Sequence, residues 1–95
     1  MGIPTIEQTI LRMKDEVEED IETGRVPPTV KRFSELHDYV DANAYGGFCE
    51  DGFADAMIEH FGGRDEHDGM PDAMLHYINE AQSAIDTWLQ AGRPH

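Results

Sequence analysis

Apolar residues recur with the period of an α-helix near both ends of this chain, and that pattern constrains its fold more than any other feature. Near the N terminus they follow at steps of four, three, four and four residues, which lines one helix face: Ile6, Ile10, Met13, Val17 and Ile21. Near the C terminus a second series keeps helical spacing for about five turns: Met74, Ile78, Ala81, Ile85, Trp88 and Leu89. No stretch alternates with a period of two over β-favouring residues, so we expect no sheet; a small hairpin near residues 24–32 is the alternative.

The first helix is predicted over residues 5–23. Thr5 and Gln8 have the spacing of a capping box, in which each side chain accepts a hydrogen bond from the other residue's backbone N–H. Gly24 supplies a left-handed stop, and the Pro-Pro pair after Val26 prevents continuation. The chain therefore leaves the first helix at Gly24.

A second helix is predicted over residues 29–43. Its apolar positions again lie near a 3.6-residue period: Val30, Phe33, Leu36 or His37, Val40 and Ala44. Thr29 and Ser34 are both good N-caps, and we favour Thr29 as the start. With Ser34 as the cap, Glu35 just after it would complement the helix dipole.

A short third helix is predicted with Asp51 as its N-cap and Gly62-Gly63 as its stop. Its inward residues are Phe53, Met57, Ile58 and Phe61. The fourth helix places Pro71 in its first turn and ends before Gly92 and Pro94. We therefore expect residues 1–95 to form a single all-α domain, a compact bundle of four helices in which the first and fourth are the longest and pack as an antiparallel pair.

Residues 41–52, DANAYGGFCEDG, resemble a calcium loop in their first positions. Asp41 and Asn43 fall where such a loop places its first two ligands, and Gly46 falls at its sharp turn. The fifth and twelfth positions, which need an oxygen ligand and a bidentate glutamate, are Tyr45 and Gly52. The segment is therefore interpreted as a helix stop, a glycine turn and a new cap, without a bound cation.

The densest set of potential metal ligands lies between the third and fourth predicted helices. It comprises His60, Asp65, Glu66, His67 and Asp68, of which His60 and His67 could offer two imidazoles to zinc or nickel. A spacing of seven is not a known metal signature, and no metal or other cofactor is predicted. His37 and His76 lie next to apolar positions and are expected to be half-buried packing residues.

Catalytic motifs are not found in the sequence. There is no P-loop, dinucleotide fingerprint, HExxH or nucleophile elbow, and Cys49 has no partner with a recognisable signature, so an enzyme is not expected. Phe48 and Phe53 flank Cys49, which is expected to be buried. A single cysteine excludes an internal disulfide, no leader opens the chain and no apolar run could span a bilayer, so we expect a soluble, cytoplasmic protein.

Charge is the second strong feature of the chain. Twenty acidic against seven basic residues give a formal net charge of −13, which repels nucleic acids and anionic membranes. The charge is concentrated in DEVEEDIE, residues 15–22, where Val17 and Ile21 are core positions and the other six are acidic: Asp15, Glu16, Glu18, Glu19, Asp20 and Glu22. At about 1.5 Å of helix rise per residue these charges lie about 2 Å apart, near the ~1.7 Å per charge of duplex DNA. The six acids are the predicted partner-binding residues, and a solvated helix face is the alternative.

The stretch FSELHDYVDANAYGG, residues 33–47, resembles small uncharacterised proteins encoded by bacteriophages and other mobile elements. In size and acidity the chain is also similar to anti-CRISPR and other DNA-mimic inhibitors. The first group has no established catalytic residues, so Phe33, Leu36 and Val40 are interpreted as core and Asp38 and Asp41 as surface. These resemblances imply an inhibitor that binds a host protein.

Together these features predict a non-enzymatic acidic protein that occupies a basic, normally nucleic-acid-binding, surface of a host protein. The alternative is a structural or oligomeric accessory protein whose acidity serves solubility or salt adaptation. A third hypothesis is a metal-binding sensor or enzyme that uses His60 and His67.

Overall fold

The computed structural model describes residues 3–50, 52–62 and 72–94, and all of its regular elements are helical. In chain order they are α1 (Ile6–Glu22), α2 (Phe33–Leu36), the 3₁₀ helix η1 (Ala42–Gly47), α3 (Phe53–His60) and α4 (Asp72–Gln90). No strand occurs in these residues, which confirms the predicted all-α class. With 17 and 19 residues, α1 and α4 are the longest of these helices, as predicted.

Helix α1 begins where the capping box predicts. The N–H of Gln8 donates to Thr5 Oγ1 at 3.2 Å, and the N–H of Thr5 donates to Gln8 Oε1 at 2.9 Å, so two otherwise unpaired donors of the first turn are satisfied. At the other end Gly24 has a φ of 82°, which reverses the chain and lets the N–H groups of Arg25 and Val26 donate to the carbonyl oxygen of Asp20.

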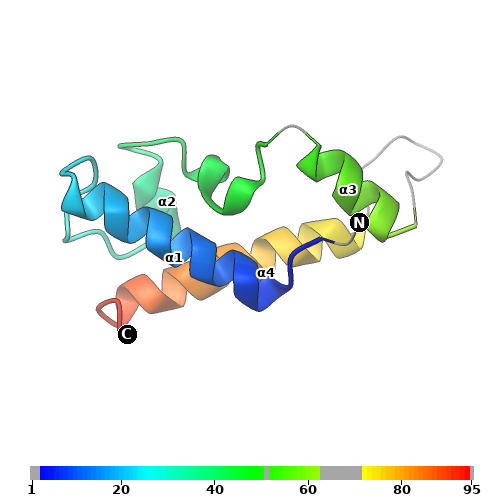
Figure 1. The fold of residues 1–95 in the computed structure, drawn as a ribbon. Coiled ribbons are helices and arrows are strands. Elements are labelled where there is room, and N and C mark those ends of the chain that lie inside the picture. Colours follow the sequence, from blue (N-terminus) through cyan, green and yellow to red (C-terminus); the bar gives the residue numbers. More distant parts are fainter. Residues whose placement is uncertain (1–2, 51, 63–71, 95) are drawn as a thin grey trace.

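Helices α1 and α4 run side by side in the same direction, so the predicted antiparallel pairing is wrong (Figure 1). Near their N-terminal ends, Thr9 and Tyr77 form a hydrogen bond, and near their C-terminal ends Arg93 donates to Glu18. The reason lies in the segments between them. Helix α2, η1 and α3 form a second layer along the pair and return the chain to the N-terminal end of α1 before α4 begins (Figure 1). The molecule is elongated, with principal extents of 43 × 22 × 21 Å.

The predicted second helix over residues 29–43 is broken into two short pieces. Helix α2 spans four residues, after which the N–H groups of Asp38 and Tyr39 bond to carbonyl oxygens three residues earlier. The side chain of Asp41 then accepts a hydrogen bond from the N–H of Asn43 at 3.2 Å and caps η1. A side chain that accepts a hydrogen bond from a backbone N–H close by in sequence competes with the hydrogen bonds of a continuous helix. This competition explains the break.

Both N-caps proposed for the second helix are also wrong. The N-cap of α2 is Arg32, and neither Thr29 nor Ser34 makes a capping hydrogen bond there. The acceptor for the first N–H of α2 comes instead from α4, where Asp86 Oδ1 accepts the N–H of Phe33 at 2.9 Å.

For α3, the residue before the helix is Gly52, with a φ of 84°. Two predicted positions lie outside the described residues: Asp51, the predicted cap of α3, and Pro71, predicted in the first turn of α4.

The core lies between α1 and α4 and beneath α2 and η1. Its largest fully buried side chains include Met13 and Val17 from α1, Leu36 from α2 and Ile85 and Leu89 from α4, which confirms the predicted inward faces. Tyr45 from η1, with 5% of its surface exposed, joins this core although the sequence did not indicate it. Met57 of α3 is also fully buried, outside this main cluster.

Candidate acidic face and surface grooves

Three of the six predicted partner-binding acids are exposed on α1. Asp15, Glu19 and Glu22 follow at steps of four and three residues, so they form one stripe along the helix. Over this stripe the helix rises about 10 Å. None of the three takes part in a salt bridge within the described residues. We call Asp15, Glu19 and Glu22 the acidic stripe.

The other three acids of the run are partly buried and contact other parts of the chain. Glu16 accepts from Arg12 Nε at 3.0 Å, one helical turn away, and Glu18 accepts from Arg93 Nη1 at 2.8 Å. Asp20 accepts from the hydroxyl of Tyr45 at 2.5 Å, with Arg25 at 3.4 Å from its other oxygen. Glu18 therefore links α1 to the C-terminal segment and Asp20 links it to η1, whereas the contact of Glu16 stays within α1. That outcome could not be predicted from spacing, because two of the partners are distant in sequence.

The contact between Asp20 and Tyr45 lies on the buried side of α1 and affects the pKa of the Tyr45 phenol. Burial raises the pKa of the Tyr45 phenol well above its usual value, and the hydrogen bond to the Asp20 carboxylate and the negative charges of Asp20 and Glu16 raise it further. Each of these effects opposes loss of the phenolic proton. Tyr45 therefore stays a hydrogen-bond donor and holds η1 on α1.

Arg12 joins α1 to the turn after η1. It contacts Glu50 in addition to Glu16. The hydrogen bond to Glu50 is the largest of the effects that raise the pKa of Arg12 above its usual value, with the bond to Glu16 and the two negative charges adding to it and partial burial opposing it. Arg12 and Glu50 are substantially exposed and Glu16 is partly exposed, so this contact positions the turn more than it stabilises the fold.

An exposed leucine lies next to the acidic stripe. Leu11, one turn before Asp15, is 59% exposed and borders a small hollow of about 180 Å³. Trp88 lies in the wall of this hollow, with Lys14 Nζ 5.7 Å from its ring centroid and its indole N–H donating to the carbonyl oxygen of Pro94. The hollow is small, and it adds an apolar contact beside the stripe.

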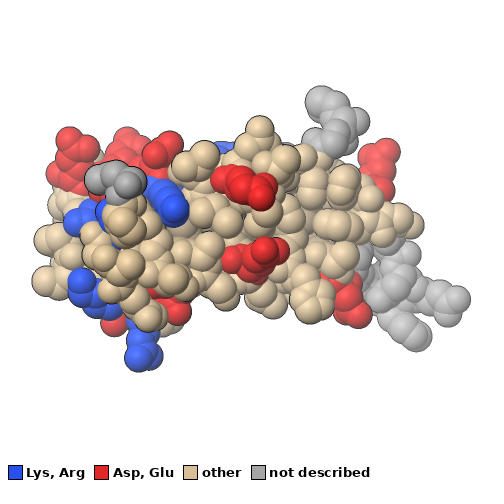
Figure 2. All heavy atoms as spheres, turned by 90° about the horizontal axis from the view of Figure 1, so that it is seen from below, with Lys and Arg blue, Asp and Glu red and all other residues tan. Residues whose placement is uncertain are grey.

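Charges of opposite sign are unevenly distributed over the molecule. Figure 2 shows lysine and arginine side chains gathered at the end where α1 and α4 terminate, next to a crowd of acidic side chains, while the other end of this face shows acidic side chains alone among the coloured residues. None of the described basic residues precedes residue 12, and all of them lie outside α3 and α4: Arg12, Lys14, Arg25, Lys31, Arg32 and Arg93.

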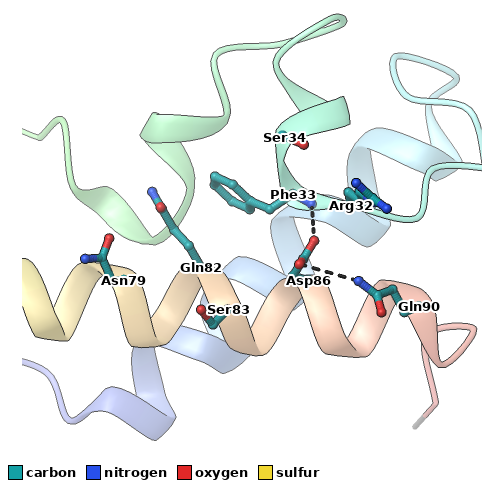
Figure 3. A pocket seen from close by; sticks show the side chains of 8 residues that line it. All are labelled: Arg32, Phe33, Ser34, Asn79, Gln82, Ser83, Asp86 and Gln90. Atoms are coloured by element: carbon teal, nitrogen blue, oxygen red, sulfur yellow. Dashed lines mark hydrogen bonds between the residues drawn. The ribbon is translucent and has the colours of Figure 1, made fainter.

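A polar groove of about 400 Å³ lies between α2 and α4. Figure 3 shows Gln82 of α4 rising beside the ring of Phe33, Asn79 further toward the start of α4, and Asp86 joined to the Phe33 backbone and to Gln90. Arg32, Ser34 and Ser83 complete the lining. Phe33 is 93% buried and Asp86 is occupied by the α2 backbone, so the groove offers amides and hydroxyls for hydrogen bonding and little apolar surface.

A larger groove of about 540 Å³ lies at the opposite end, between the start of α1, the end of α3 and the start of α4. Most of its lining is apolar: Ile3, Pro4, Ile6, Phe61, Ala73 and Tyr77. His60, His76 and Glu80 supply polar atoms at its edges. These residues come from three separate segments, so no local pattern could have identified the groove. We call it the apolar groove.

His37 and His76, which were expected to be half-buried packing residues, are exposed, and so is Cys49, which was expected to be buried. His37 lies edge-on to the ring of Phe33 at 5.5 Å, and the Cys49 thiol donates to the carbonyl oxygen of Asn43 at 3.3 Å. For His37 and Cys49 the predictions were wrong because α2 ends at Leu36 and the chain turns again at Gly46 and Gly47, which leaves both side chains exposed. His76 lies on the exposed side of α4.

The segment that resembles a calcium loop acts as a turn. Gly46 and Gly47 both have left-handed backbones, with φ of 75° and 82°, and Asp41 is engaged with the N–H of Asn43. In the parts of the chain that the structure describes, no group of three or more His, Cys, Asp or Glu residues could hold a metal ion. His60 is exposed at the end of α3, while Asp65, Glu66, His67 and Asp68 lie outside the described residues.

Within the described ranges, none of the helices is long and apolar enough to cross a membrane. Comparison of the chain with models of protein families, with curated proteins and with solved structures finds no match in any of the three. The resemblance of residues 33–47 to phage-encoded proteins therefore stays a prediction, and the function has to be argued from the surface of the molecule.

Proposed function

We propose that this protein is a non-enzymatic binding protein that occupies a basic, normally nucleic-acid-binding, surface of a host protein, as a phage or mobile-element inhibitor of the anti-CRISPR or DNA-mimic type would. The observation that carries the proposal is the alignment of Asp15, Glu19 and Glu22 as exposed carboxylates on one face of a long, well-anchored helix. A rigid row of like charges attracts a surface of opposite charge and accelerates the encounter.

The exposed stripe is less dense in charge than the whole acidic run. Its three carboxylates occupy about 10 Å of helix, compared with one phosphate per ~3.4 Å along each strand of duplex DNA. The stripe would therefore engage a few lysines or arginines of the partner and would not reproduce a complete nucleic-acid backbone. Leu11, exposed one turn before Asp15, supports protein recognition, because an apolar contact beside a charged row favours a protein surface over simple ions.

The alternative function, an accessory protein whose acidity serves solubility, is also supported by one observation. Glu16, Glu18 and Asp20 form contacts within the chain, so part of the acidic run already has a structural role. Under this hypothesis the exposed stripe would only be solvated.

The two hypotheses are separated by capture from host lysate at low and high salt. The test variant is Asp15→Asn/Glu19→Gln/Glu22→Gln, which retains size and helix propensity while removing three charges. The control is Asp38→Asn/Asp41→Asn/Glu50→Gln, which removes three exposed charges outside the acidic stripe and the grooves and keeps an oxygen acceptor for the Asn43 N–H and for Arg12. A charge-recognised partner should be lost at high salt, compete with DNA or RNA, and bind the control but not the test variant. If both variants retain the same partners, the stripe is solvation only and the accessory hypothesis replaces the proposal.

A further inference from the structure

We propose that the apolar groove is a second docking site, which takes a segment of a protein partner carrying apolar side chains flanked by lysine or arginine. Its lining residues come from the start of α1, the end of α3 and the start of α4. These parts of the helices lie at the end of the molecule away from the C-terminal half of α1, which carries the acidic stripe (Figure 1). The inference shares with the proposed function only the basic character of the partner. It rests on different residues and on a different experiment.

The lining of the groove accounts for the apolar part of this partner. Ile3, Ile6, Phe61 and Tyr77 are each only half-buried in the free protein, so a partner side chain would remove further apolar surface from water. The volume of about 540 Å³ falls within the range of binding pockets and exceeds that of the polar groove beside α2. Apolar burial is therefore the main source of affinity available at this site.

The floor of the groove is held in place before any partner binds. The hydroxyl of Tyr77 donates to the carbonyl oxygen of Pro4 at 2.8 Å, and the buried Thr9 hydroxyl lies 2.5 Å from it, where it can donate. This chain of hydrogen bonds ties the segment before α1 to the first half of α4. Because the segment before α1 and the first half of α4 are already held together, little conformational entropy would be lost on docking.

The charges around the groove account for the basic part of the partner. The described segments that form it, residues 3–11, 52–62 and 72–83, carry five exposed acids and neither lysine nor arginine: Glu7, Asp55, Glu59, Asp72 and Glu80. Basic residues beside an apolar anchor would meet these carboxylates. A second copy of this chain is a poor occupant, because it would bring the same acids face to face.

The test uses a defined probe, a fluorescein-labelled eighteen-residue amphipathic helix composed of leucine and lysine, measured by fluorescence anisotropy at 150 mM salt. Two companions carry serine in place of leucine, or glutamate in place of lysine. We expect the leucine–lysine peptide to bind at least tenfold more tightly than either companion, and the NMR signals of Ile6, Ala73 and Tyr77 to shift on its addition. Equal binding of the serine–lysine peptide would show attraction by net charge alone and would overturn the proposal, as would the absence of binding.

Ala73→Lys tests the location of the site. Ala73 is exposed in the first turn of α4, so the longer side chain should block the groove without disturbing the core. Ala91→Lys, just beyond the other end of α4, makes the same change of charge at an exposed alanine that lines none of the grooves. We expect Ala73→Lys to weaken the peptide at least tenfold and Ala91→Lys less than threefold, with both proteins unfolding at the wild-type temperature. Equal effects of the two changes would place the peptide elsewhere. If the acidic-stripe variant alone fails to capture a partner from lysate, that result concerns the proposed function and not the apolar groove.

Discussion

Gly46 is a position at which a single residue restricts how η1 can pack on α1. Its backbone has a φ of 75°, and a Cβ placed there would lie 3.0 Å from Met13 Cγ and 3.1 Å from Thr9 Cγ2 of α1. Glycine is therefore needed both for the left-handed turn and for the close approach of η1 to α1. The same turn sets Tyr45 against Asp20, so the contact between the two elements depends on this residue.

Gly46→Ala is expected to destabilise the protein more than Gly24→Ala. Both glycines have left-handed backbones, and an alanine there costs about 1–2 kcal/mol, but Gly24 has open space where Gly46 faces two side chains. Overpacking should add about 1–3 kcal/mol at Gly46 alone. Urea denaturation of both variants measures the difference. Equal losses would mean that Met13 and Thr9 move aside without cost.

At the scale of elements, α2 is a helix that its own sequence does not support. Four residues are too few to be stable alone, and no side chain at Thr29 or Ser34 caps them. The fold supplies the missing interactions: Phe33 and Leu36 are buried, and Asp86 of α4 accepts the N–H of Phe33. A side chain 53 residues away in sequence thus replaces a local cap.

Asp86→Ala should therefore loosen α2 while leaving α4 helical. Removal of the acceptor leaves the N–H of Phe33 without its partner, which we expect to cost about 1–2 kcal/mol. Hydrogen exchange at the Phe33 amide should become faster, whereas amides in the middle of α1 should change only with global stability. Asp86→Asn keeps an oxygen at this position and should show a smaller effect. Unchanged exchange at Phe33 in the alanine variant would contradict this account of the cap.

For the whole molecule, the net charge of −13 opposes the compact state. Four ion pairs link described residues, and each has an exposed or half-exposed partner, so together they offset only part of the repulsion: Arg12–Glu16, Arg12–Glu50, Arg25–Asp20 and Arg93–Glu18. Salt screens both the attraction within the ion pairs and the repulsion among the twenty acids. The repulsion is the larger of these two contributions.

The melting temperature should accordingly rise with sodium chloride. Between 20 and 500 mM we expect a gain of about 1 kcal/mol, equivalent to roughly 4–8 °C for a domain of this size. Thermal unfolding followed by circular dichroism measures this shift. The variant Asp15→Asn/Glu19→Gln/Glu22→Gln, with three charges fewer, should show a smaller rise. A melting temperature that falls with salt would mean that the ion pairs outweigh the repulsion.

The sequence alone determined those features that depend on neighbours a few residues apart. The inward faces of α1 and α4, the capping box at Thr5 and the stop at Gly24 follow from helical periodicity, local hydrogen bonds and backbone freedom, and all were predicted. The exposure of Asp15, Glu19 and Glu22 agrees with the same periodicity, which places them away from Met13 and Val17.

The remaining features depend on contacts between segments that are distant along the chain, so local patterns could not predict them. The parallel direction of α1 and α4 results from the return path through α2, η1 and α3, which no local pattern encodes. The break after Leu36 follows from competition between helical hydrogen bonds and the hydrogen bond from the Asn43 N–H to the Asp41 side chain. Which of these hydrogen bonds forms depends on where Phe33 and Tyr45 can be buried. The division of the acidic run into exposed and internally bonded carboxylates, and the apolar groove, likewise exist only once Arg93, Tyr45 and Tyr77 have been brought to α1.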